Sequence, residues 1–142
     1  MTRSPGAPAT HSAVSAYAAR HRLDGSALRS DGRLTLRFDG RYRVQLRPAA
    51  DGRIAVVSRL LDLSGRPRAD ADEALRQLAT LACGLLRQDA AALCIDTPES
   101  ALVLQQVLPA DTDVEQLESQ LAAFVNALAF WTRACAPHAV SA

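Results

Sequence analysis

The sequence predicts an α+β fold in which helices pack on an antiparallel, twisted sheet, with the element order α-β-β-β-α-β-β-α. Apolar residues recur at helical spacing in three segments and follow strand patterns in five others. The chain of 142 residues has the length of one domain. We therefore expect a single domain over residues 10–136, between an N-terminal tail over 1–9 and a C-terminal tail over 137–142.

The first helix is expected to begin near Thr10 or Ser12 and to end at about His21. It is short, so it needs packing to persist. Its apolar side carries Val14, Tyr17 and Ala18.

Two strands with period-two patterns follow, at residues 34–38 and 42–46. The Asp-Gly pair between them is typical of a two-residue hairpin turn, but that loop would mix the apolar and polar faces. The hydrophobic pattern requires Phe38 opposite Tyr42. We therefore predict a loop of odd length over residues 39–41, or a bulge beside it.

The third strand, residues 54–60, is almost continuously apolar. Such a strand is expected to be covered on both faces. Residues 64–67 form the loop that ends this region.

The second helix is predicted from an acidic N-cap pair, Asp70 with Glu73, to about Gln88. Leu81 widens its apolar stripe beyond what one sheet face covers. That breadth is expected of a helix between the core and a second subunit. The stripe consists of Leu75, Leu78, Ala82, Leu85 and Leu86.

The last two strands are predicted at residues 92–96 and 101–108, joined by a turn over 97–100. In the second of them, Leu102, Leu104, Gln106 and Leu108 share one face, and Val103 and Val107 the other. Next, Thr112 and Glu115 fit a T-x-x-E capping box for the longest helix, which Pro137 ends. The apolar stripe of that helix is Val114, Leu117, Leu121, Phe124, Leu128 and Trp131.

The sequence predicts no catalytic, cofactor-binding or metal-binding residue, and no cofactor. Nucleophile elbows, H-E-x-x-H and C-x-x-C spacings and glycine-rich phosphate loops are all missing from it. His21 is expected at a helix end on the surface, and His11 and His138 in mobile segments. The three cysteines lie in apolar stretches and are expected to be reduced and buried.

A formal net charge of +1 argues against a nucleic-acid partner. The charge is unevenly spread: residues 33–68 hold nine Arg against three acids, and residues 69–142 three Arg against ten acids. This fits docking to a partner or a second copy, or else two solvated faces. Arg37 and Arg43 could grip acidic groups of a partner, or be solvated strand residues.

The N-terminal residues lack the continuous apolar core of a signal peptide, and no apolar run approaches the length that spans a bilayer. We therefore expect a cytoplasmic protein without membrane insertion.

Three segments together resemble a known family: Leu34-Thr-Leu-Arg-Phe-Asp-Gly-Arg-Tyr-Arg-Val-Gln-Leu46, Leu102-Val-Leu-Gln-Gln-Val-Leu-Pro109, and the helix from Leu117 to Trp131 with its Phe-Val and Phe-Trp pairs. Their order and spacing resemble the class I type III secretion chaperones of the Tir chaperone (CesT-like) family. The resemblance covers roughly residues 10 to 136.

The resemblance implies a homodimer that binds the N-terminal segment of a secreted effector, keeps it soluble and competent for secretion, and has the secretion ATPase as a further partner. By position, it places the dimer interface at Leu78, Leu81, Leu85, Leu93 and Ile95. It places effector binding at Val14, Tyr17, Phe38, Val44 and Val56, to which we add Arg37 and Arg43. Each of these positions could instead belong to the core.

Members of this family are typically acidic, so the Arg-rich sheet suggests a cargo with acidic segments. The final helix also resembles regulatory chaperones that sequester an anti-activator and couple secretion to transcription. The sequence leaves both roles open.

Overall fold

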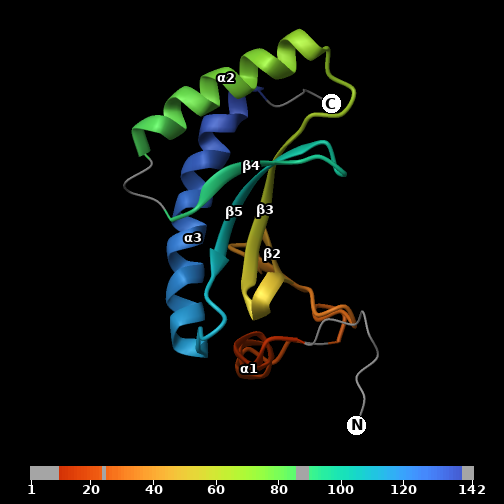
Figure 1. Ribbon diagram of the computed structural model, residues 1–142, viewed down its shortest axis with the longest axis vertical. Helices are drawn as coiled ribbons and strands as arrows, with labels where there is room; N and C mark the ends of the chain where they lie inside the picture. Colours follow the sequence, from red (N-terminus) through yellow and green to blue (C-terminus); the bar gives the residue numbers. More distant parts are fainter. Residues whose placement is uncertain (1–9, 24, 86–89, 139–142) are drawn as a thin grey trace.

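The computed structural model describes residues 10–23, 25–85 and 90–138, with the backbone alone at 84 and 85 (Figure 1). The predicted order of elements is confirmed. The expected tail over 1–9 and the expected helix end at Gln88 lie outside the described residues, as do the last four residues of the expected C-terminal tail. The elements are α1 (Ser12–Arg20), β1 (Leu34–Phe38), β2 (Tyr42–Pro48), a 3-10 turn (Ala50–Gly52), β3 (Ile54–Asp62), α2 (Arg68–Leu85), β4 (Ala92–Asp96), β5 (Ala101–Leu108), α3 (Val114–Cys135) and a second 3-10 turn (Ala136–His138).

The five strands form one antiparallel sheet in the order β1-β2-β3-β5-β4. β1 and β4 are therefore its two edges. The long helix α3 runs along the sheet, with α1 near one end and α2 near the other (Figure 1). We call the sheet face toward α3 the inner face and the opposite one the outer face.

The hairpin of β1 and β2 has the predicted register, with Phe38 opposite Tyr42 and Leu36 opposite Val44. Asp39 and Gly40 adopt positive φ angles of 53° and 67°, and the Arg41 amide donates to the Phe38 carbonyl over 3.1 Å. The three-residue loop keeps every apolar residue of the hairpin on one face, as the pattern required.

The core lies between the inner face, α1 and α3, where the side chains of Phe124, Leu121 and Leu117 are almost fully buried. Leu102, Leu104 and Leu108 point into it, as predicted for β5. β3 is covered on both faces as expected, because Ala55 and Val57 form a small second cluster on the outer face. The other buried members of that cluster are Ala101 and Val103, with Ala49 and Cys94 packed against them.

The capping prediction for α3 was wrong by one residue. The N-cap is Asp113, whose carboxylate accepts from the Gln116 amide over 2.8 Å, while the Gln116 side chain accepts from the Asp113 amide over 3.0 Å. Thr112 cannot cap the helix because its hydroxyl donates to the Pro109 carbonyl over 2.7 Å. Two overlapping capping boxes were present, and the preceding turn selects between them.

We expect Asp113→Ala to lower the free energy of unfolding by about 1 kcal/mol, because it removes the cap of the longest helix. Urea denaturation followed by circular dichroism measures this. Asp111→Ala, which removes an exposed neighbouring carboxylate, is the control and should leave the midpoint unchanged. Equal midpoints for the two variants would contradict the cap.

The start of α2 also differs from the prediction. The helix begins at Arg68, and the amides of Asp70 and Ala71 both donate to the Pro67 carbonyl over 3.1 Å. Asp70 therefore lies within the first turn, where a carboxylate still complements the helix dipole, instead of capping the helix. Because Pro67 directly precedes the first helical residue, α2 begins two residues before the predicted N-cap Asp70.

Candidate docking surfaces

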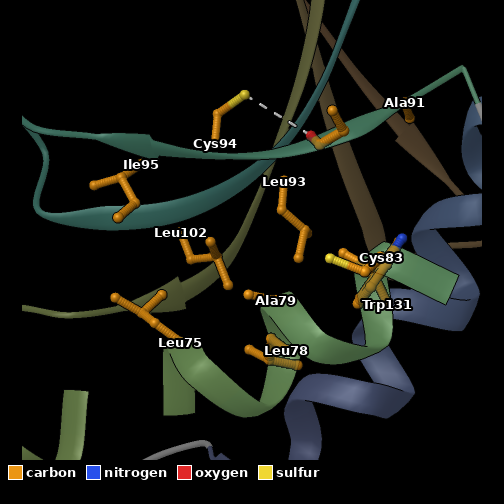
Figure 2. Close-up of a pocket in the computed structure, with 12 residues that line it drawn as sticks. Leu75, Leu78, Ala79, Cys83, Ala91, Leu93, Cys94, Ile95, Leu102 and Trp131 are labelled. Carbon is orange, nitrogen blue, oxygen red and sulfur yellow. Dashed lines mark hydrogen bonds between the residues drawn. The ribbon is translucent and has the colours of Figure 1, made fainter. Parts of the chain in front are cut away.

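An apolar groove separates α2 from the edge strand β4 (Figure 2). Leu75, Leu78 and Ala79 on α2 face Leu93 and Leu102 of the sheet across it. The groove has a volume of about 370 Å³. Its remaining lining residues are Ala82, Cys83, Ala91, Ala92, Cys94, Ile95 and Trp131. We call this surface the α2–β4 groove.

Two of the residues predicted at the dimer interface are large apolar side chains left in solvent. Leu81 is 41% exposed and Ile95 53% exposed. Leu93 is half-buried, and Leu78 is only 2% exposed because it anchors α2 to the core. Leu85 lies in α2, but its side chain is outside the described part of the chain. The groove therefore offers apolar surface to another polypeptide chiefly through Leu93 and Ile95, while Leu81 adds exposed apolar surface on α2 outside the groove lining.

Four of the seven residues predicted to bind an effector belong to the core, the alternative that the sequence had left open. Val14, Tyr17, Val44 and Val56 are all buried between α1, the sheet and α3. Strand and helix periodicity identified the correct face for each, but that face is already covered within the protomer. These four side chains are not available to a partner unless the core opens.

The other three, Phe38, Arg37 and Arg43, lie at or near the tip of the β1–β2 hairpin. Phe38 is half-buried, and both arginines are exposed. Arg37 lies directly opposite Arg43 on the outer face, so two like charges are paired across the strands. Such pairs are unfavourable.

The outer edge of β1 is only partly covered. The Thr35 amide donates to the Ala27 carbonyl over 3.0 Å, and the Arg29 amide donates to the Arg33 carbonyl over 2.8 Å. Since backbone groups of alternate residues point to the same side of a strand, those of Arg37 point to the same open edge as those of Thr35. Within the described ranges, the Arg37 amide and carbonyl have no hydrogen-bond partner at that edge.

The cysteines differ in exposure, which corrects the expectation that all three are buried. Cys135 is buried, and burial raises the pKa of its thiol to about 11. Cys94 is half-buried, and Figure 2 shows its side chain pointing away from α2. Cys83 is exposed and lines the α2–β4 groove.

In a maleimide reaction at about pH 8, we expect Cys135 to react only on unfolding, because the thiolate is the reactive form. Cys83 should react in the native protein, and more slowly when the α2–β4 groove is covered by a partner. Mass spectrometry of peptides after timed quenching measures both rates. Native labelling of Cys135 as fast as that of Cys83 would contradict the burial.

The histidines have structural positions. His11 was expected in a mobile segment, but its ring accepts from the Ala13 amide over 3.0 Å as the N-cap of α1, and its Nε2 lies 2.7 Å from the Ala110 carbonyl oxygen. His21 is exposed at the end of α1, as predicted, with Nε2 2.9 Å from a Glu118 carboxylate oxygen. Through this bond and the nearby Arg20, the pKa of Glu118 is lowered.

Among residues 10–23, 25–85 and 90–138, no group of three metal-ligating side chains is assembled. Over the same residues, no helix is long and apolar enough to span a membrane.

The described residues thus combine an α+β fold with an open apolar groove, a half-open strand edge and a charged hairpin. The chain belongs to the Tir chaperone protein (CesT) family, whose model matches residues 15–132. This confirms the resemblance inferred from the three sequence segments. No curated protein matches the chain in sequence.

Solved structures of type III secretion chaperones share the fold. A chain of the HopA1–SchA chaperone–effector complex superposes with a TM-score of 0.63 at 15% identity, covering 89% of this chain and 99% of that one. A chain of the ExsC–ExsE complex gives a TM-score of 0.63 at 22% identity, covering 85% and 89%. The Yersinia pestis type III secretion chaperone SycH, solved with a fragment of YscM2, gives 0.58 at 19% identity, covering 85% and 98%.

Sequence reasoning missed part of the groove. Trp131 and Leu102 line it although both belong to stripes that predict core residues, and both are indeed almost fully buried. Each side chain packs in the core and also forms part of the wall of the groove. Periodicity alone carries no signal for that double role.

Proposed function

We propose that this protein is a cytoplasmic, non-enzymatic type III secretion chaperone that binds the N-terminal segment of a cognate effector and keeps it soluble for export. The observation that carries the proposal is the match to the CesT family over residues 15–132. The apolar and edge surfaces of the described chain supply what such binding requires, because an extended segment is held through grooves and strand edges.

The α2–β4 groove, together with the exposed Leu81 of α2, supports a homodimer as the working form. Leu81 and Ile95 would each lose their contact with water at an interface between two copies, and burial of apolar surface contributes about 25 cal/mol per Å². A twofold axis at this face would present each groove to the same surface of the other copy. The single domain over residues 10–136 would then be one half of the functional unit.

The β1 edge supports cargo binding by strand addition. Arg37 offers a backbone donor and acceptor there, and the half-buried Phe38 offers an adjacent apolar surface. An added strand gains main-chain hydrogen bonds that do not depend on its sequence, and pockets beside the edge then select side chains. The ordering entropy of the cargo must be offset by this contact area.

The test is capture of the cargo from the native host with an affinity-tagged chain, followed by limited proteolysis of the complex. We expect a secreted protein whose N-terminal segment alone resists proteolysis. Capture of a protein protected only outside its N-terminal segment would overturn the proposal.

The regulatory role is the second candidate. The similarity to a chain of the ExsC–ExsE complex shows a shared fold and is equally compatible with a small regulatory partner. The same capture decides between the two: an anti-activator that is wholly enclosed by the chaperone favours regulation. The secretion ATPase stays a predicted further partner.

A further inference from the structure

The sheet splits between β2 and β3. The two strands are paired from Pro48 and Ile54 to Gln45 and Val57, and the ladder then stops. β3 continues beside β5 instead, as far as Asp62. Beyond the split, the Ser58 hydroxyl donates to the Arg43 carbonyl over 2.7 Å. The hairpin tip therefore diverges from the second half of β3.

A cleft of about 710 Å³ lies where β2 and β3 separate. We call it the sheet cleft. Its walls combine guanidinium groups with apolar side chains such as Val57, Leu60 and Val103. The charged residues that line it are Arg29, Arg33, Arg41, Arg43, Arg47, Arg59, Asp96 and Glu99.

The six arginines of the sheet cleft outnumber its two acids. Arg59 lies 2.7 Å from Glu99, and Arg47 lies 3.9 Å from Asp96. Arg33 has a partner outside the lining, Asp31, at 3.6 Å.

The other three, Arg29, Arg41 and Arg43, have no acidic partner within 4.0 Å in the part of the chain that the structure describes. Arg41 is held with its guanidinium 5.0 Å from the centre of the Tyr42 ring. Of these three, Arg41 and Arg43 lie at the hairpin tip, which therefore carries two guanidinium groups without an acidic partner among the described residues.

The cross-strand pairing places Arg37, which is outside the cleft lining, directly opposite Arg43. Two like charges directly opposite each other destabilise a hairpin, and an anion placed beside them would turn repulsion into two attractions. Arginine forks favour carboxylates and phosphates as bidentate partners.

We propose that the sheet cleft binds an acidic peptide segment, in which carboxylates reach Arg41 and Arg43 while small apolar residues pack on the half-buried Tyr42 and Leu60. This deepens the proposed function, on which it rests, by assigning the cargo an acidic segment. A peptide fits better than a nucleic acid, because part of the lining is apolar and the whole chain carries a net charge of only +1.

The test uses a fluorescein-labelled peptide of alternating Glu and Ala, with a Gln-Ala peptide of the same length as the uncharged control. Fluorescence anisotropy should show that the Glu-Ala peptide binds and the Gln-Ala peptide does not. Added salt should lower the affinity for the Glu-Ala peptide. The double variant Arg41→Gln/Arg43→Gln should bind it about tenfold more weakly. The matched control Arg68→Gln/Arg133→Gln removes two exposed arginines from the helices and should keep the wild-type affinity.

Equal losses in the two double variants would overturn the proposal, since they would reflect net charge and no particular site. Stronger competition by inorganic phosphate or a single-stranded oligonucleotide than by unlabelled Glu-Ala peptide would also overturn it. If the wild-type chain captures its effector but ignores the Glu-Ala peptide, the sheet cleft assignment fails and the chaperone function stands. If the wild-type chain binds the Glu-Ala peptide but captures no exported protein, the chaperone function fails and the assignment of the sheet cleft to acidic peptides stands.

Discussion

Replacing Leu81 and Ile95 together by Asp is expected to convert the proposed dimer into a folded monomer. Both side chains are exposed in the protomer, so the charges remain solvated and the fold is retained. At the interface of a dimer the same charges would be desolvated without partners, at a cost of about 3–5 kcal/mol.

Light scattering should give half the wild-type mass, with unchanged far-ultraviolet circular dichroism. Val107→Asp is the matched control, because Val107 is 46% exposed but lies on the outer face, away from the α2–β4 groove. That variant should keep the wild-type mass. A dimer that survives both charges at Leu81 and Ile95 would remove the groove from the interface.

Arg37→Pro is expected to weaken cargo binding about thirtyfold while leaving the chaperone folded. Proline removes the Arg37 amide proton, which points to the open edge of β1 and takes no part in the ladder with β2. An added strand would keep a carbonyl without its donor, at a cost of about 2 kcal/mol.

The measurement is the dissociation constant for the protease-resistant cargo segment by titration calorimetry. Arg37→Gln is the control, since it removes the same charge and keeps the amide. Equal affinities for the two variants would mean that the cargo does not pair with β1, and that any loss is due to charge alone.

Much of the fold followed from the sequence because the hydrophobic patterns are regular. The register of the hairpin could be predicted because a two-residue loop would have placed Phe38 among arginines. The first residues of the helices were harder to predict. At α2 and α3, capping residues compete with a proline or a turn a few positions away, and the choice depends on hydrogen bonds such as that from Thr112 to Pro109.

The docking surfaces were less predictable than the fold. Alternation places Val44 and Val56 on an apolar face, but only the packing of α1 and α3 shows that this face is closed. Leu81 differs because it lies outside the narrow stripe of α2, and that excess of apolar residues was visible in the sequence. The sheet cleft could not be foreseen, since it depends on where the pairing of β2 and β3 stops.

The strand order also sets the distance that a bound cargo chain must span to reach both subunits. β4 borders the proposed dimer interface and β1 is the opposite edge, so the two β1 edges would face outward at the far ends of the assembly. With neighbouring strands about 4.8 Å apart, these edges would be about 40 Å or more from each other. An extended polypeptide rises about 3.3 Å per residue, so only a stretch longer than about twelve residues could engage both subunits at once. Shorter stretches would bind one subunit and forgo the gain in avidity that tethering provides.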